Sequence, residues 1–209
     1  MKKLVALLLA LVMVFLLIGC GANPKEKEAH AQKAEISRGK IENGIYTNDF
    51  LGITFTKPQS WIFSTDEEIA ALINISAESF LNENLKEILE NNPTIYDMMV
   101  KDILTNTNIN VTFENLEKSF ATNITEEQYA EVVKQQYANL TGMSVTFAEE
   151  INTVKLGEAD FTQIVCSVEA YGVNMTQIYY FRKVDKYMGS VIVTITSGYT
   201  VEDIEAMFK

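Results

Sequence analysis

FTQIVCSVEAY, MTQIYYFRKV and MGSVIVTITS, residues 161–171, 175–184 and 188–197, are three strand-like segments that decide the fold. Each is rich in β-branched and aromatic residues, and short turns separate them. In the first segment every second side chain, from Thr162 through Cys166 to Ala170, is expected to lie on one buried face. With a further strand-like segment at 145–155, the pattern predicts an antiparallel meander.

Shorter strand patterns precede the meander. Two brief segments, 45–47 and 53–56, flank a turn, and two longer ones, 96–104 and 109–114, surround a polar turn. Strict alternation of apolar and polar residues in 109–114 is typical of a half-buried strand.

Helix patterns lie between these strands. Thr65, Thr125 and Thr200 each begin a capping box, with an acidic or amide side chain three residues later. We predict a helical region from Asp66 to about Asn91 that breaks near residues 74–76, a second helix after Thr125 and a short final helix. Antiparallel strand pairs with helices between them indicate an α+β domain.

The first twenty residues have the order of a secretory signal. Lys2 and Lys3 precede an unbroken apolar run over 4–18, which is shorter than the roughly 20 residues that cross a bilayer core. Leu17, Gly19 and Cys20 then resemble the bacterial lipobox. That resemblance implies cleavage between Gly19 and Cys20 and transfer of diacylglycerol to the Cys20 thiol.

The expected organisation follows from that motif. We interpret 1–19 as a lipoprotein signal peptide, 20–42 as the lipidated cysteine with a flexible tether, and 43–209 as a single domain. The protein would be extracytoplasmic and attached to the membrane through lipid on Cys20. In a Gram-positive cell this is the outer face of the cytoplasmic membrane. His30, the only histidine, lies in the tether.

Charge narrows the range of partners. The chain has a formal charge of −11, and loss of Lys2 and Lys3 with the signal leaves 15 basic against 28 acidic residues, or −13. Such a field repels phosphate backbones, so we expect no nucleic-acid partner. Acyl chains, and not surface charge, would hold the protein at a membrane.

The usual catalytic motifs are missing from the predicted domain, so we expect it not to be an enzyme. Residues 43–209 contain no histidine to activate a nucleophile, and Cys166 is expected to be an inert buried thiol. The chain carries no glycine-rich phosphate loop and no calcium-binding loop. The sequence therefore predicts no catalytic residue, no cofactor and no metal site.

Two other groups of residues could carry a function. A glycosidase needs only two carboxylates in a cleft, and the candidate pairs are Glu149 with Glu150 and Asp102 with Glu114. In a chain this acidic, such pairs are more simply interpreted as a solvated surface. The single tryptophan, Trp61, and the aromatic cluster of the last strands are interpreted mainly as core; the cluster comprises Tyr171, Tyr179, Tyr180, Phe181 and Tyr187.

A short opening motif carries a family resemblance. Gly44-Ile45-Tyr46, Leu51-Gly52-Ile53-Thr54-Phe55, Pro58 and Trp61, followed by a helix, paired strands and a meander, resemble the PsbP-like fold. This fold is named after a photosynthetic accessory protein and also occurs in a eukaryotic Ran-binding protein and in small bacterial lipoproteins. The resemblance implies a central antiparallel sheet flanked by helices on both faces. It implies no particular site, because one fold hosts unrelated activities.

Three functional hypotheses remain open from the sequence. The leading one is a membrane-anchored, non-enzymatic binding or accessory module whose partner is an envelope protein or a small ligand. The second is a carboxylate-based hydrolase acting on cell-wall or external glycans. The third is a structural component of an envelope complex.

Overall fold

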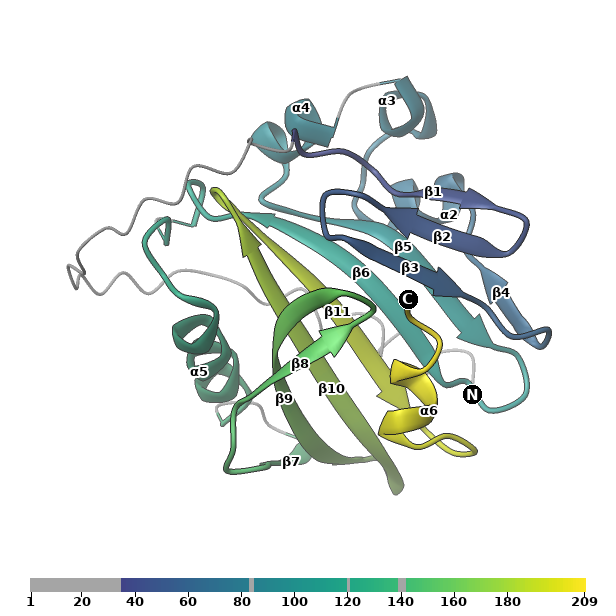
Figure 1. The fold of residues 1–209 in the computed structure, drawn as a ribbon, viewed down its shortest axis with the longest axis vertical. Helices are drawn as coiled ribbons and strands as arrows, with labels where there is room; N and C mark the ends of the chain where they lie inside the picture. Colours follow the sequence, from purple (N-terminus) through teal and green to yellow (C-terminus); the bar gives the residue numbers. More distant parts are fainter. Residues whose placement is uncertain (1–34, 83–84, 120, 139–141) are drawn as a thin grey trace.

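The computed structural model describes residues 35–82, 85–119, 121–138 and 142–209. Within them the chain forms an α+β protein with two antiparallel sheets and a few short helices (Figure 1). The large sheet has eight strands and the small sheet three. Cys20, Gly19 and His30 lie outside the described residues, and so does the predicted signal peptide.

The small sheet contains the two short strands predicted near the start of the domain, together with one more. Its strands are β1 (Lys40–Glu42), β2 (Ile45–Asn48) and β3 (Ile53–Thr56), in the order β1-β2-β3. The C-terminus extends it, since Lys209 and Thr54 exchange backbone hydrogen bonds of 3.1 and 2.8 Å. Gly157 permits this approach, because a Cβ there would lie 2.1 Å from the carbonyl carbon of Lys209.

The large sheet joins the middle of the chain to the meander. Its order is β4-β5-β6-β11-β10-β9-β7, and β8 also pairs with β9. The two parts are joined by antiparallel pairing of β6 with β11, which are far apart in the sequence, and this pairing places Val111 opposite Val191. The predicted strand at 145–155 is two strands that pair with different parts of β9. The bounds are β4 (Trp61–Phe63), β5 (Thr94–Asp102), β6 (Asn108–Asn115), β7 (Met143–Phe147), β8 (Asn152–Leu156), β9 (Ala159–Ala170), β10 (Val173–Val184) and β11 (Tyr187–Ile195).

Three of the described helices, α2, α5 and α6, begin where the capping boxes predicted. In each box the threonine hydroxyl accepts a hydrogen bond from the backbone N–H three residues later. The side chain of that later residue accepts in turn from the threonine N–H, at Thr65, Thr125 and Thr200. The predicted break near 74–76 is confirmed, with Asn74 at a positive φ of 57°. The helices are α2 (Asp66–Leu72), α3 (Ala77–Asn82), α4 (Leu85–Asn91), α5 (Glu126–Ala138) and α6 (Val201–Glu205). Among the described residues, no helix is both long and apolar enough to span a membrane.

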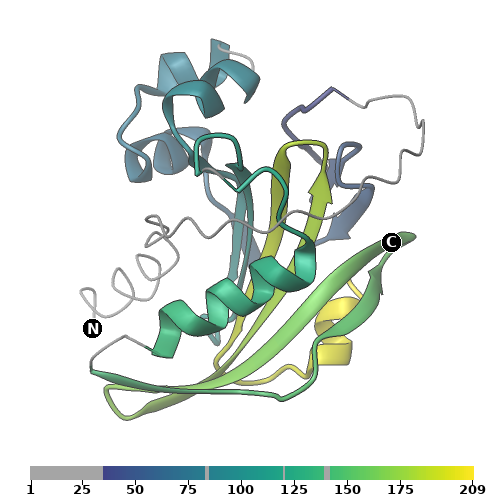
Figure 2. The same ribbon diagram turned by 90° about the vertical axis from the view of Figure 1, so that its left-hand side faces the viewer.

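The two faces of the large sheet are covered differently (Figure 2). On one, the α5 face, Tyr129 of α5 donates to Glu114 and its ring packs on Phe181. On the other, the small-sheet face, Phe50 of the β2–β3 turn packs on Phe113, and Glu205 of α6 accepts from Tyr180. The resemblance implied helices on both faces, and the structure adds a second sheet to the cover of one of them.

A buried carboxylate ties the small sheet to the large one. Asp97 of β5 is 2% exposed, and burial raises its pKa. The Asp97 carboxylate accepts from the Tyr46 hydroxyl at 2.6 Å, the Asn48 amide at 3.0 Å and the Gly39 N–H at 2.8 Å. The Arg38 guanidinium adds an ion pair at 3.4 Å. A buried charge needs such partners, because removing it from water is costly.

These contacts extend the folded unit upstream of residue 43. Ile36 is buried, Arg38 stacks on the Phe80 ring at 3.9 Å, and a Cβ on Gly39 would lie 2.1 Å from the Tyr46 ring. The predicted tether, residues 20–42, included these residues, because nothing in the local sequence distinguishes Arg38 and Gly39 from a linker.

Tyr46→Phe tests this carboxylate cluster. The substitution keeps the buried ring but removes one donor from Asp97, so we expect the free energy of unfolding to fall by about 1–3 kcal/mol. Denaturant titration followed by circular dichroism measures the loss. Tyr171→Phe is the matched control, because Tyr171 is 65% exposed. Equal stability of the two variants would contradict the role of the cluster.

Candidate functional site

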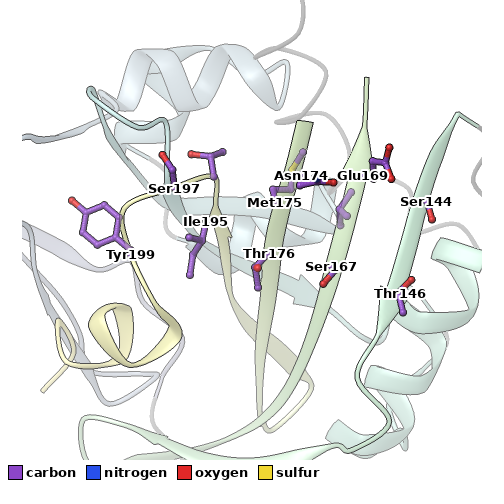
Figure 3. Close-up of a pocket in the computed structure, with 12 residues that line it drawn as sticks. Ser144, Thr146, Ser167, Glu169, Asn174, Met175, Thr176, Ile195, Ser197 and Tyr199 are labelled. Atoms are coloured by element: carbon purple, nitrogen blue, oxygen red, sulfur yellow. The ribbon is translucent and has the colours of Figure 1, made fainter. Parts of the chain in front are cut away.

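The candidate site is a hollow on the small-sheet face, formed by β7, β9, β10 and β11 (Figure 3). Its volume is about 490 Å³. The residues that line it are Ser144, Thr146, Ser167, Val168, Glu169, Asn174, Met175, Thr176, Ile195, Thr196, Ser197 and Tyr199. Most of these side chains are small and polar, which distinguishes the hollow from the apolar core beside it.

The strand register arranges the floor of the hollow in two rows. In one row Thr146 lies opposite Ser167, Ser167 opposite Thr176, and Thr176 opposite Ile195. In the other, Glu169 lies between Ser144 and Asn174. Because opposed residues of paired strands point to the same face, each row crosses the sheet as a continuous line of side chains. We call these two rows the polar floor.

The alternating pattern of the strands explains why the floor is exposed. Cys166, Val168 and Ala170 of β9 are buried, whereas Ser167 and Glu169 between them are exposed. Strands with one buried and one solvated face show this alternation. The prediction that helices cover both faces of the meander is wrong at this end of the sheet, because the small-sheet face is open to solvent here.

A hydrogen-bonded chain forms one rim of the hollow. The indole N–H of Trp61 donates to the Tyr199 hydroxyl at 2.8 Å, and that hydroxyl donates to Asp102 at 3.3 Å. Burial acts to raise the pKa of Asp102, but hydrogen bonds from the Leu104 N–H and the Thr105 hydroxyl, among others, leave that pKa lowered. Trp61 is fully buried, so its predicted role in the core is confirmed.

The Tyr199 segment is also fixed to the β5–β6 turn. The Thr107 hydroxyl donates to the carbonyl of Ser197 at 3.2 Å, and Thr196 donates from its hydroxyl to the carbonyl of Thr105. Residues far apart in the sequence thus hold the rim in place. These contacts fix the position of Tyr199 beside the floor.

The floor offers hydrogen bonds without an evident catalytic group. Its hydroxyls and the Asn174 amide both donate and accept, and Glu169 is the one ionisable side chain in the two rows. Over the described part of the chain, no three histidine, cysteine or acidic side chains are close enough to hold a metal ion. The arrangement can bind a polar molecule through several neutral contacts.

The acid pairs considered from the sequence do not form a common site. Asp102 accepts from Tyr199 on the small-sheet face, whereas Glu114 accepts from Tyr129 on the α5 face. Glu149 and Glu150 are exposed in the connection between β7 and β8 and do not line the hollow. Neighbouring strands bring Asp102 and Glu114 into one sheet but direct their side chains to opposite sides.

The aromatic cluster of the last strands is mostly core, as predicted. Tyr179 and Phe181 stack on the α5 face, where the Tyr179 hydroxyl bonds to Tyr137 and to Gln177. Tyr180 lies on the opposite face and Tyr187 is buried, whereas Tyr171 is exposed at a turn. Cys166 is buried beneath the same helix, and burial raises its pKa to about 12. The predicted burial of Cys166 in the core is therefore confirmed.

Comparisons with known proteins give little further constraint. No protein-family model matches the sequence, and no curated protein is significantly similar to it. Among solved structures, a crystal structure from Bacteroides thetaiotaomicron VPI-5482 is similar at 12% sequence identity and a TM-score of 0.38. The alignment covers 83% of this chain and 48% of the other, so this chain spans about half the length of that protein. A similarity at this level assigns no family.

Tyr199→Phe tests the rim. It leaves the buried Trp61 N–H without its acceptor, so we expect about 1–3 kcal/mol less stability. Fluorescence of Trp61, the only tryptophan, follows denaturant unfolding directly. Tyr187→Phe, in a tyrosine at the opposite end of β11, should leave the Trp61 emission spectrum unchanged. An unaltered unfolding midpoint in Tyr199→Phe would contradict the bridging role of Tyr199.

Proposed function

We propose that this protein is a lipid-anchored, extracytoplasmic binding module without catalytic activity, and that the polar floor is its ligand surface. The observation that carries the proposal is the polar floor, whose two side-chain rows cross four and three strands and are exposed at Ser144, Thr146, Ser167, Glu169 and Asn174. Solvated sheet faces are common, but this one is hollowed and bounded by a fixed aromatic rim. Its volume falls within the range of about 300–1,000 Å³ that is typical of small-molecule sites.

The chemistry of the floor favours a neutral ligand rich in hydroxyl groups, such as a glycan. Ser144, Thr146, Ser167 and Thr176 can each exchange hydrogen bonds with hydroxyls, and the Asn174 amide adds a paired donor and acceptor. The chain carries a charge of −11, which opposes an anionic ligand. Tyr199 bounds the floor at one rim, and its hydroxyl is held by Trp61 and Asp102.

The amino-terminal sequence supports the proposed location. Leu17, Gly19 and Cys20 follow an apolar run with a cationic head, which is the order of a lipoprotein signal. Two or three acyl chains on Cys20 would provide stable attachment, since each buried methylene contributes about 0.8 kcal/mol. The folded unit begins by Ile36, so a short segment would join it to the lipid.

We also propose membership of the PsbP-like group for the fold. The opening motif of Gly44-Ile45-Tyr46, Leu51-Gly52-Ile53 and Trp61 supports it, as does an antiparallel sheet with helices on both faces. This membership would not specify a ligand, because the fold hosts unrelated activities. The ligand proposal therefore rests on the floor alone.

Removal of hydroxyls from the floor tests the ligand surface. Calorimetric titration of the full chain with maltohexaose, cellohexaose and chitohexaose should show binding of at least one neutral oligosaccharide. In the variant Ser144→Ala/Thr146→Val/Ser167→Ala, we expect the dissociation constant to rise about tenfold or more, because three hydrogen-bonding groups are lost.

Thr153→Val is the matched control for this experiment. Thr153 is an exposed threonine of β8 that lies outside the hollow. It should leave the affinity unchanged. Equal binding by the triple variant would remove the floor from the proposal, and no binding of any of the three sugars would overturn the ligand class.

Cys20→Ser tests the anchor. Without the thiol no thioether to lipid forms, so we expect the protein to leave the membrane fraction and to lose labelling by a radioactive fatty acid. Fractionation and autoradiography of expressing cells measure both effects. Cys166→Ala is the control, since Cys166 is buried and should not affect labelling. A Cys20→Ser protein that remains in the membrane fraction would refute the lipid anchor.

A further inference from the structure

Within the described part of the chain, the outer edge of β7 is unpaired. β7 (Met143–Phe147) is the terminal strand of the large sheet, and no other described strand pairs with its outer side. Its sequence, MSVTF, contains no charged residue, proline or glycine. The opposite edge strand, β4, is only three residues long, and β8 carries Lys155. In a chain of charge −11, five consecutive uncharged residues on an open edge are a distinct feature.

Open edges of this kind are usually blocked. Unpaired N–H and C=O groups on an edge strand form a template for another strand, and proteins protect them with charges, proline or a very short strand. β7 has none of these protections. Such an edge fits a partner that pairs with it in the native state.

We propose that β7 pairs antiparallel with β7 of a second copy of this chain, which joins the two large sheets into one. The strand is complementary to itself under two-fold symmetry. Met143, Val145 and Phe147 alternate with Ser144 and Thr146. With Val145 on the axis, Ser144 would lie opposite Thr146 of the second copy. Like side chains then meet like on each face, as an isologous interface requires.

The α5 side of the strand supports this occupant. Met143, Val145 and Phe147 are half-buried, and Phe147 already packs against Tyr137 with ring centroids 5.7 Å apart. A second copy would bring three more apolar side chains of the same strand beside them and cover what remains exposed. A charged strand from another protein would instead place charges against this apolar row. The inference goes beyond the proposed function and does not depend on the identity of the ligand.

Cysteine crosslinking in intact cells tests the pairing. In the full chain, Val145→Cys should form a disulfide-linked dimer on oxidation with copper phenanthroline, because residues opposite each other at the axis lie within disulfide range. Ser167→Cys is the control. Two copies of Ser167 would be three strand spacings apart, about 14 Å, which is too far for a disulfide. The unmodified chain, which has only its natural cysteines, gives the background level of crosslinked dimer.

Paired lysine substitutions separate edge pairing from general charge effects. Ser144→Lys/Thr146→Lys in the Val145→Cys chain sets like charges directly opposite each other, so we expect roughly tenfold less crosslinked dimer. Ser167→Lys/Asn174→Lys adds the same charge to exposed positions on β9 and β10, inside the edge, and should retain the dimer.

Three outcomes would overturn the proposal. They are no dimer from Val145→Cys, an equal dimer from Ser167→Cys, and a crosslink to a different protein in place of the dimer. Loss of the dimer in both lysine variants would also count against it, because the edge would then have no special role. Oligosaccharide binding that persists in a chain without dimer would leave the ligand proposal standing.

Discussion

The buried carboxylate of Asp97 is the constraint on which the rest of this structure depends. A charge out of water must be surrounded by donors, and here all four come from a short stretch between Arg38 and Asn48. Their convergence holds the small sheet against one end of the large sheet. The same face at the other end is left to solvent, and that is where the polar floor lies. The Asp97 contacts thus determine which end of this face is covered by the small sheet and which end remains exposed.

Local signals in the sequence predicted local structure well. The helix starts at Thr65 and Thr125 follow from capping chemistry that involves only neighbouring residues, and Asn74 breaks the first helical region because it adopts a left-handed conformation. Features that depend on distant residues were not predicted. The pairing of β6 with β11 and the attachment of Arg38 and Gly39 to Asp97 require partners that no local pattern specifies.

The candidate site was missed for a related reason, although a signal for it was present. The alternation of Ser167 and Glu169 with apolar neighbours is visible in the sequence. A helix was expected to cover this face, however, so the polar positions did not indicate a solvent-exposed site. Whether a polar strand face is covered depends on where other elements pack, which strand periodicity does not encode. Asp102 and Glu114 lie at opposite ends of the β5–β6 pair, because Glu114 is opposite Thr94 whereas Asp102 bonds to Thr107 at the turn. They also point to opposite faces, so neighbouring strands do not bring these two acids together.

The polar floor and the edge of β7 are parts of one surface, and this links the two proposals physically. Ser144 and Thr146 line the hollow and also belong to the edge strand. In the two-fold pair their rows would continue into the second copy, so the floor would become eight strands wide. A long ligand that contacts both copies would stabilise the pair, and the pair would in turn bind that ligand more tightly, because coupling between two binding events is reciprocal. Short ligands that stay within one floor would bind without this coupling, so ligand length, more than ligand chemistry, would determine whether binding and assembly are linked.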